Sequence, residues 1–347
     1  MKKILHDLSW EELAALVASL GEKPFRARQL YEGLMQGKRL TEIPVSAALR
    51  TRLLEEYEDE PVRIHEVFTS KDGTKKFLFL LADGNLIEGV LMKYKYGNTQ
   101  CVSTQVGCRM GCKFCASTLG GRVRDLTAGE ILCQILTVNR LEGGNLKERA
   151  VTNVVLMGSG EPFDNYDNVV KFLKSVTAEG GIHISARNIS LSTCGLVPEM
   201  KRFAEEGIPL NLTVSLHAVT DEARSRTMPI ANRYSIAEIL DACAYYFERT
   251  GRRYIFEYSL IEGENADEEH ARALAKLLKG RPCHVNLIRL NAVEERSLQG
   301  TDENTAQKFL ETLTSLGISA TLRRSMGSDI GGACGQLRAK YLGNKGE

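Results

Sequence analysis

Long apolar runs are missing from this sequence. The strongest run, residues 77–82, is far shorter than the ~20 residues that a membrane-spanning helix needs. The N-terminus carries two lysines but no apolar segment, and acidic residues follow at once, so we do not expect a signal peptide. Tandem repeats and low-complexity tracts are missing too. These absences argue against a membrane protein and against an exported one.

A dominant charge is also missing. The 45 basic and 44 acidic residues leave a net charge of +1, which neither requires nor excludes a nucleic-acid partner. RNA binding would need local clusters of positive charge. Such clusters are Lys23, Arg26 and Arg28; Lys75 and Lys76; Lys93 and Lys95; Arg109, Lys113, Arg122 and Arg124; Arg249, Arg252 and Arg253; Arg323 and Arg324.

The composition that remains is that of a soluble globular protein. Apolar residues make up 43% of the chain and charged residues 26%. A length of 347 residues suffices for one large domain or two ordinary ones. The nine cysteines are an odd number in a chain without an export signal, which indicates a reducing cytoplasm rather than a set of disulfides.

Three of the cysteines lie close together in the run VGCRMGCKFCAST. Cys108, Cys112 and Cys115 have the spacing C-x3-C-x2-C. Cubane iron–sulfur clusters are usually held by four thiolates, one per iron, so a trio with no fourth partner nearby leaves one iron open to a substrate or cofactor. Zinc is the competing interpretation. However, zinc sites usually combine a C-x2-C pair with a second pair or with histidines, and no second pair occurs here.

The pattern along the chain changes from helices to hairpins and then to alternating strands and helices. Residues 1–60 are expected to form three helices, the first with a capping box at Ser9 and Glu12. Residues 62–92 contain three strand-like segments with alternating apolar positions. Two Asp-Gly turns separate these segments, which is typical of β-hairpins. The later alternation indicates a parallel sheet or barrel. Its expected strands are 99–105, 153–157, 188–192, 211–216, 254–260, 284–288 and 320–324.

Polar groups gather at the carboxyl ends of these expected strands, where α/β barrels place their working residues. The second strand runs into a glycine-rich turn at 158–162, and the third and fourth end near Ser192 and His217. The sixth leads to Asn291. Glycine permits a close backbone approach, and serine, histidine and asparagine can bind an amino acid and a ribose. These groups predict a ligand pocket beside the cysteine loop.

Two further side chains could carry chemistry. Glu88 falls in an apolar row with Val90 and Met92, so it is either a salt-bridged residue or a proton acceptor beside a buried site. Cys334 is surrounded by glycines that leave its thiol room to act as a nucleophile, and the alternative is a small buried hydrophobe. Cys101 is near the cysteine trio in sequence.

Several segments together resemble one family. They are IEGVLM, QCVSTQVGCRMGCKFCAST, GSGEP, LSTCG, VSLHA, NLIRLN and DIGGACGQLR, and they span nearly the whole chain. The family is that of the bacterial radical S-adenosylmethionine (SAM) enzymes that methylate C2 of adenine in 23S ribosomal RNA and in tRNA. The adenine-C8 methyltransferases that confer antibiotic resistance are close relatives. The GEP turn and the ending LRRSMGSDIGGACGQLR are more similar to the C2 group.

The resemblance implies an α/β fold class. It consists of a partial (βα)6 radical-SAM barrel with an N-terminal helical accessory domain and a short β-meander linker. The implied domains are a helical unit that docks RNA (1–60), the meander with Glu88 (61–93), the core barrel (94–329) and a C-terminal loop with Cys334 (330–347).

The resemblance also implies a division of roles. Cys334 would receive a methyl group from one SAM and become S-methylcysteine, and a second SAM would yield the radical that activates it. Glu88 would accept the proton from the adenine ring, and Cys101 would release the RNA by forming a transient disulfide with Cys334. The implied 4Fe-4S ligands are Cys108, Cys112 and Cys115, and the implied SAM contacts are Gly160, Glu161, Ser192, Ser215, Leu216, His217 and Asn291.

The implied partners are 23S rRNA, tRNA and an electron donor such as flavodoxin or ferredoxin. No membrane partner is expected, and the enzyme is expected to be a cytoplasmic monomer. One departure from the family is Ser159, which replaces a methionine in the turn MGSGEP. The alternatives are adenine-C8 methylation, a radical-SAM enzyme that modifies a protein, and a zinc- or cluster-binding RNA protein without enzymatic activity.

Overall fold

The computed structural model describes residues 2–331 except 292 and 294. The predicted methyl carrier, Cys334, therefore lies outside the described residues. None of the described helices is both long and apolar enough to cross a membrane.

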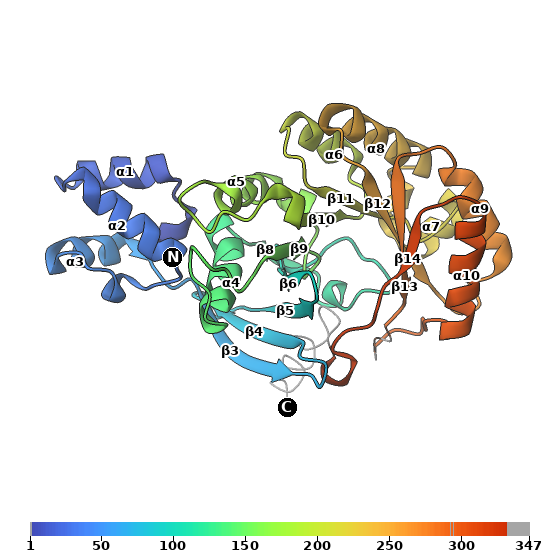
Figure 1. Cartoon of the computed structure of the whole chain (residues 1–347), viewed down its shortest axis with the longest axis horizontal. Coiled ribbons are helices and arrows are strands. Elements are labelled where there is room, and N and C mark those ends of the chain that lie inside the picture. Colours follow the sequence, from blue (N-terminus) through green and yellow to red (C-terminus); the bar gives the residue numbers. More distant parts are fainter. Residues whose placement is uncertain (1, 292, 294, 332–347) are drawn as a thin grey trace.

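The first sixty residues form a helical unit at one end of the molecule (Figure 1). Ser9 accepts a hydrogen bond from the Glu12 N–H at 3.1 Å, and Glu12 accepts one from the Ser9 N–H at 2.7 Å, so the expected capping box is confirmed. The elements are β1 (Lys3–Ile4), η1 (Leu5–Asp7), α1 (Trp10–Ser19), α2 (Pro24–Met35), η2 (Leu40–Glu42), α3 (Ala47–Glu56) and β2 (Tyr57–Glu58), with β1 and β2 paired in parallel.

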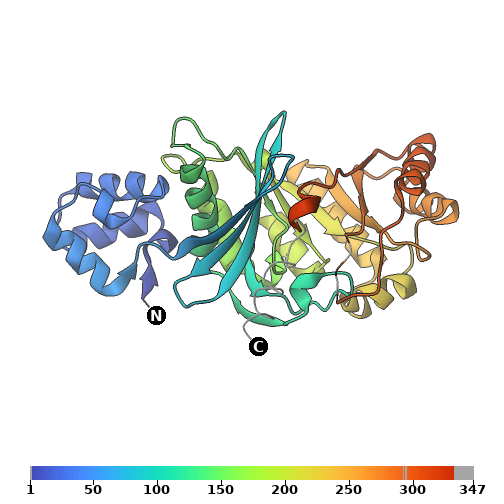
Figure 2. The same cartoon turned by 90° about the horizontal axis from the view of Figure 1, so that it is seen from below.

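A ten-stranded sheet forms the framework of the remaining described chain. In spatial order its strands are β14 (Ala320–Leu322), β13 (Cys283–Arg289), β12 (Tyr254–Leu260), β11 (Asn211–Ser215), β10 (Ile189–Thr193), β9 (Asn153–Leu156), β6 (Gly97–Cys101), β5 (Leu86–Tyr94), β4 (Lys75–Leu81) and β3 (Val62–Thr69). The strands from β14 to β6 run parallel, and β5, β4 and β3 continue the sheet antiparallel. The expected barrel is confirmed, but the meander is hydrogen-bonded into its sheet and is more than a linker (Figure 2).

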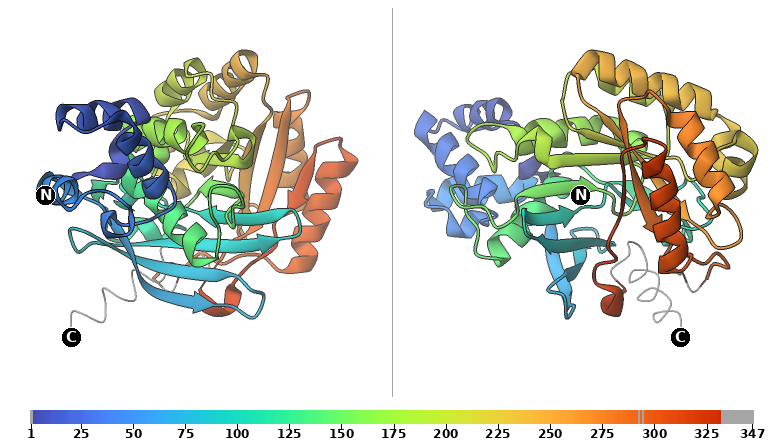
Figure 3. Two further views of the ribbon diagram at one scale, coloured as in Figure 1. Left: turned by 60° about the vertical axis from the view of Figure 1, so that its left-hand side comes forward. Right: turned by 45° about the vertical axis from the view of Figure 1, so that its right-hand side comes forward.

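Helices cover the outer face of this sheet (Figure 3). They are α4 (Ala128–Leu141), α5 (Tyr166–Thr177), α6 (Val197–Glu205), α7 (Asp221–Thr227), α8 (Ile236–Thr250), α9 (Glu268–Leu278) and α10 (Glu303–Ser315), with the short turns η3 (Ala116–Thr118), η4 (Pro162–Asn165), η5 (Ala186–Asn188), η6 (Pro229–Asn232) and η7 (Ser328–Ile330). Each long helix turns an apolar stripe toward the strands, which buries the main core.

Alternation along β5 separates the two faces of the sheet. Ile87 and Leu91 belong to the main core. Val90 and Met92 instead form a small cluster with Cys101 on β6, which pairs with Val90 in the strand register. Since side chains alternate along a strand, Glu88 lies on the same face as Val90 and Met92, as its place in the sequence predicted.

The first barrel strand is shorter than the sequence suggested. The expectation of a strand over residues 99–105 was wrong, because β6 ends at Cys101 and a separate strand, β7 (Gln105–Gly107), begins at Gln105. β7 pairs with β8 (Arg122–Asp125) in a two-stranded antiparallel sheet. This hairpin carries the cysteine loop at its tip.

The segment after β14 crosses to the turn between β3 and β4. The Gly327 N–H donates to Asp72 at 2.9 Å, and the Ser70 hydroxyl donates to Asp329 at 2.5 Å. Lys76 on β4 donates to the Gly331 carbonyl oxygen at 2.6 Å. The crossing joins the two edge regions of the ten-stranded sheet.

Candidate active site

The cysteine loop is closed at its base by a close backbone contact. Gly107, at the end of β7, has a φ of +77°, and a Cβ there would overlap the Gly121 carbonyl oxygen. The Cys108 N–H donates to that same oxygen at 3.0 Å. Within the loop Cys108 and Cys112 are buried, and Cys115 is partly buried.

The three thiols are close enough to affect one another's ionisation. Burial raises the pKa of Cys108 to about 12, with a further contribution from Cys115. Burial, followed by Cys115 and Cys108, also raises the pKa of Cys112 well above its ordinary value. Bound iron would favour the thiolate form of these cysteines, because a nearby positive charge lowers the pKa of a thiol.

The chemistry of the trio fits a cluster. Each thiolate of a 4Fe-4S site binds a different iron, so Cys108, Cys112 and Cys115 would ligate three irons and leave the fourth without a protein ligand. Among the described residues, no group of three histidine, cysteine or carboxylate side chains is placed to bind a single metal ion.

The basic residues around the loop are largely paired within the protein. Arg109 forms an ion pair with Asp164 on η4, and Arg122 lies 3.5 Å from the same carboxylate. Arg124 pairs with Glu130 at 2.8 Å. These three arginines of the basic cluster hold the loop against its neighbours, and an RNA contact of this cluster stays a prediction.

The glycine-rich turn follows β9 and packs against the segment after β6. Gly160 has a φ of +110°, and a Cβ on it would lie 2.7 Å from Gln105. A Cβ on Gly158 would lie 2.6 Å from the Val102 carbonyl oxygen. We expected these glycines to permit the approach of a ligand. The structure shows that they permit the approach of another loop of the same chain.

Glu161 joins two loops at the rim of the barrel. Its buried carboxylate accepts hydrogen bonds from the Cys194 N–H at 2.7 Å and from the Phe163 N–H at 3.0 Å. Burial raises the pKa of this carboxyl group, and these hydrogen bonds oppose the rise. Glu161 therefore ties the turn after β9 to the end of β10.

A polar row lies across β10, β12 and β14. The Ser192 hydroxyl donates to Glu257 at 3.1 Å, and Arg323 lies 3.7 Å from the same carboxylate. Burial raises the pKa of Glu257. Groups of this kind can bind ribose hydroxyls or an ammonium group. Ser192 was predicted from the sequence, whereas no pattern marked Glu257.

A buried arginine holds the loops that follow β10 and β11. Arg224 on α7 is fully buried. It donates to the carbonyl oxygens of Leu216 at 3.2 Å, Ser215 at 3.0 Å and Cys194 at 2.6 Å. Three of the rim's backbone groups are thereby fixed by one side chain. No pattern in the sequence marked Arg224, since a lone arginine in a short helix is ordinarily a surface residue.

His217 connects the rim to the cysteine loop. It has a φ of +57°, and its Nδ1 accepts a hydrogen bond from the Ser259 N–H at 2.9 Å, so the proton of the neutral ring lies on Nε2. Burial lowers the pKa of His217 to about 3, with a further contribution from Arg224. The ring meets Phe114 edge-on, with centroids 4.9 Å apart. His217 is therefore a neutral donor directly beside the cluster loop.

Glu88 is paired with a buried lysine. The Lys76 ammonium lies 2.9 Å from the Glu88 carboxylate, and the two side chains are 0% and 3% exposed. Lys76 also donates to the Gly331 carbonyl oxygen. The salt-bridged interpretation of Glu88 is confirmed by this contact, and its role as a proton acceptor stays a prediction. The sequence did not single out Lys76 as its partner.

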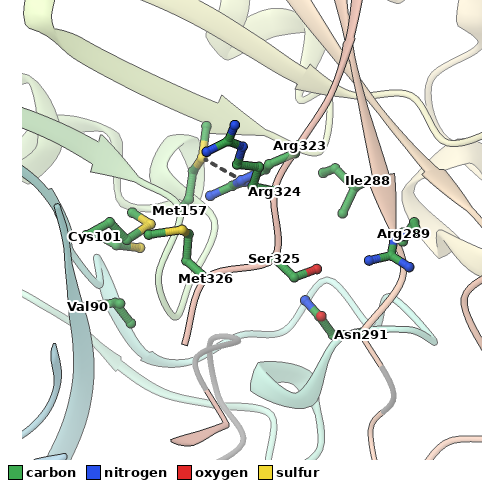
Figure 4. Close-up of a pocket in the computed structure, with 11 residues that line it drawn as sticks. Val90, Cys101, Met157, Ile288, Arg289, Asn291, Arg323, Arg324, Ser325 and Met326 are labelled. Carbon is green, nitrogen blue, oxygen red and sulfur yellow. Dashed lines mark hydrogen bonds between the residues drawn. The ribbon is translucent and has the colours of Figure 1, made fainter. Parts of the chain in front are cut away.

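Cys101 lies on the wall of a cavity of about 230 Å³. Figure 4 shows its thiol beside the thioethers of Met157 and Met326, with Arg323 and Arg324 near them. Asn291 lines the same cavity. No disulfide joins two of the eight described cysteines. The predicted pairing of Cys101 with Cys334 stays a prediction.

The chain was compared with known proteins. The family model described as "Radical SAM superfamily" matches residues 102–275. A Clostridium perfringens protein named "Probable dual-specificity RNA methyltransferase RlmN" is 53% identical over 350 residues, which cover 100% of this chain and 99% of that protein. A protein of the same name from Alkaliphilus metalliredigens is 51% identical and covers 97% of this chain and 96% of its own.

A solved structure is similar over the same length. The crystal structure of a radical SAM methyltransferase from Sphaerobacter thermophilus has a TM-score of 0.91 and 40% sequence identity to this chain. The match covers 96% of this chain and 98% of that one. The similarity thus includes the helical unit and the meander as well as the barrel.

Proposed function

Because this chain belongs to the radical SAM superfamily and, within it, to the dual-specificity RNA methyltransferases, we propose that it adds a methyl group to C2 of adenine in 23S rRNA and in tRNA. It is an RNA methyltransferase whose cofactors are a 4Fe-4S cluster and SAM. The full-length identity of about one half to RNA methyltransferases is the observation that carries this function.

The chemistry of the target explains the need for these cofactors. C2 of adenine is an electron-poor aromatic carbon without a nucleophilic lone pair, so polar displacement on the methyl group of SAM is unfavourable there. The cluster, when bound by Cys108, Cys112 and Cys115, supplies the electron that starts radical chemistry. Their mutual closeness and burial support this role.

The side chains around the cavity have complementary tasks in the proposal. Glu88 would take the ring proton, and its carboxylate is held in place by the Lys76 ammonium at 2.9 Å. His217 donates from Nε2 to SAM, while Ser192 and Asn291 bind its polar groups. Gly160, Glu161, Ser215 and Leu216 shape the backbone around it.

Cys101 and Cys334 complete the proposed reaction. Cys334 carries the methyl group as S-methylcysteine. The Cys101 thiol, on the cavity wall, then attacks the sulfur of Cys334 that is joined to the methylated adenine. Before this attack Glu88 takes the ring proton from C2, and the adduct gives up its unpaired electron, which the oxidised cluster would accept. A disulfide then forms while the bond between the sulfur and the former methyl carbon breaks. The electron pair of that bond stays on the carbon, which takes up the proton of the Cys101 thiol and becomes the new methyl group.

The partners and location follow from the substrates. A one-electron donor such as flavodoxin or ferredoxin would reduce the cluster, and the enzyme would act as a monomer in the cytoplasm, where rRNA and tRNA are. We propose these features on the chemistry of the reaction alone.

The test is an anaerobic assay with reconstituted protein, SAM, a reductant and a 23S rRNA fragment or tRNA. Nuclease digestion and mass spectrometry then identify the carbon that is methylated. We expect 2-methyladenosine with the wild type and with Cys243→Ala, a matched control in α8, and no product with Cys334→Ala. Methylation at C8 alone would contradict the proposal, and so would full activity of Cys334→Ala.

A further inference from the structure

The strand that carries Glu88 extends beyond its neighbour in the sheet. β6 ends at Cys101, whereas β5 continues past that point to Leu86. Val90 faces Cys101 in the register of this pair, so Glu88 would face Ser103 if β6 continued. Because β6 has left the sheet there, the main chain of Glu88 needs another partner on this side, since an unpaired buried carbonyl group is costly.

The Ser103 hydroxyl supplies that partner and also contacts the glycine-rich turn. It donates to the Glu88 carbonyl oxygen at 2.7 Å, and it accepts a hydrogen bond from the Ser159 N–H at 2.9 Å. Ser103 is fully buried, and Glu88 and Ser159 are buried as well. One hydroxyl group therefore joins the strand of the proposed proton acceptor to the turn that the proposed function places around SAM.

Ser103 is itself held at both of its main-chain groups. Its N–H donates to the side-chain oxygen of Gln134 at 2.9 Å, and its carbonyl oxygen accepts from the side-chain nitrogen of Gln134 at 2.9 Å. Gln134 is a fully buried residue of α4. A buried network whose members are all paired is rigid, so the hydroxyl of Ser103 has a fixed position.

Glu88 is thus fixed by two independent contacts. The ion pair with Lys76 on β4 holds the carboxylate, and the hydrogen bond from Ser103 holds the main chain. Only the second contact relates Glu88 to the turn after β9. A general base must lie within hydrogen-bond reach of the proton that it takes, and a displacement of about 1 Å can slow such a step about 100-fold.

We propose that Ser103 is a positioning residue for removal of the ring proton, because it holds Glu88 at a fixed place relative to the turn around SAM. The inference rests on the proposed function and on the role of Glu88 within it. It adds a residue that acts through Glu88 and links the SAM site to the step that follows the radical chemistry.

The test follows one anaerobic turnover of the reconstituted enzyme with an RNA fragment that the wild type methylates. Denaturing gels measure the decay of the covalent protein–RNA complex, and chromatography measures 5′-deoxyadenosine, the product of SAM cleavage. Ser103→Ala should slow the decay roughly 10- to 100-fold. The 5′-deoxyadenosine formed per cluster should not change, because SAM cleavage precedes proton removal. A first-order decay does not depend on the amount of folded enzyme.

Deuterium at C2 of the target adenine separates an effect on Glu88 from an effect on Cys101. The decay in Ser103→Ala should slow further with deuterium, because breaking the bond between C2 and hydrogen then limits the rate. Gln134→Met removes both hydrogen bonds to the Ser103 main chain and should slow the decay in the same direction, so it replaces Ser103→Ala if that variant binds no cluster.

Ser175→Ala on α5 is the matched control. It also removes a hydrogen bond from a serine hydroxyl to a carbonyl oxygen, that of Lys171 at 3.0 Å, and its complex should decay like that of the wild type.

The possible failures can be told apart. If Glu88→Gln slows the decay but Ser103→Ala and Gln134→Met decay like the control, this inference is wrong. Slow decay in Ser103→Ala without an effect of deuterium would also overturn it, since the attack by Cys101 would then be the impaired step. If the wild type forms no 5′-deoxyadenosine and methylates no rRNA or tRNA fragment, the proposed function is wrong as well.

Discussion

Breaking the ion pair between Lys76 and Glu88 should destabilise the protein severely. The two side chains are 0% and 3% exposed and their charged atoms are 2.9 Å apart. Lys76→Met would leave the buried carboxylate without this cation, which costs about 3–5 kcal/mol. In large domains 1 kcal/mol corresponds to roughly 2–4 °C in Tm, so we expect a decrease of about 6–20 °C.

The assay is anaerobic thermal unfolding of the reconstituted enzyme. Lys75→Met is the matched control, because the partner of Lys75, Glu142, keeps Lys93 at 3.3 Å and should lose less than about 1 kcal/mol. Adding Glu88→Gln to Lys76→Met should recover most of the loss, since the buried negative charge that Lys76 offset is then removed as well. Equal Tm values for Lys76→Met and Lys75→Met would refute the reasoning.

Three other predictions concern the loop, the rim and the helical unit. Gly107→Ala should abolish iron binding, because its methyl group would overlap the Gly121 carbonyl oxygen. The control Gly121→Ala, where a Cβ would meet open space, should retain iron and sulfide. Equal iron and sulfide contents in the two variants would disprove this. Arg224→Met should weaken SAM binding, measured by calorimetry, and lower the Tm. The reason is that three carbonyl groups of the rim lose their donor, at about 1–3 kcal/mol each. A variant with the SAM affinity of the wild type would show that Arg224 does not position the SAM site. Burial lowers the pKa of His6 to about 4, so between pH 6.5 and 4 the folded state binds fewer protons than the unfolded state. The free energy of unfolding should therefore decrease as the pH is lowered through this range, by about 1.4 kcal/mol per pH unit. In urea unfolding at about pH 7 and 5.5, the free energy of unfolding should decrease less for His6→Gln than for the wild type. An equal decrease in both proteins would mean that His6 is protonated in the folded state.

Local signals in the sequence were sufficient for most elements of the fold. The capping box at Ser9 and the Asp-Gly turns act over a few residues, so they could be recognised without tertiary information. The alternation around Glu88 also predicted the face on which it lies. The division between β6 and β7 was missed because an extended chain leaving a sheet has the same local pattern as a strand.

The partners of the functional residues could not be predicted in this way. Lys76 is the second of two consecutive lysines in KKFLFL. Only its position on β4, opposite β5, shows that Lys76 rather than Lys75 is buried. Glu257 and Arg224 act through contacts across several strands and loops. Such contacts depend on how the sheet curves, which no short segment encodes.

The account depends most on the cysteine loop holding a 4Fe-4S cluster with one iron open to SAM. The direct measurement is iron and sulfide analysis with electron paramagnetic resonance on anaerobically purified protein, with and without SAM. We predict about four irons and four sulfides per chain, a spectrum of the reduced cluster that changes when SAM is added, and loss of both in Cys112→Ala. Zinc in place of iron, or a spectrum that SAM does not alter, would contradict the account.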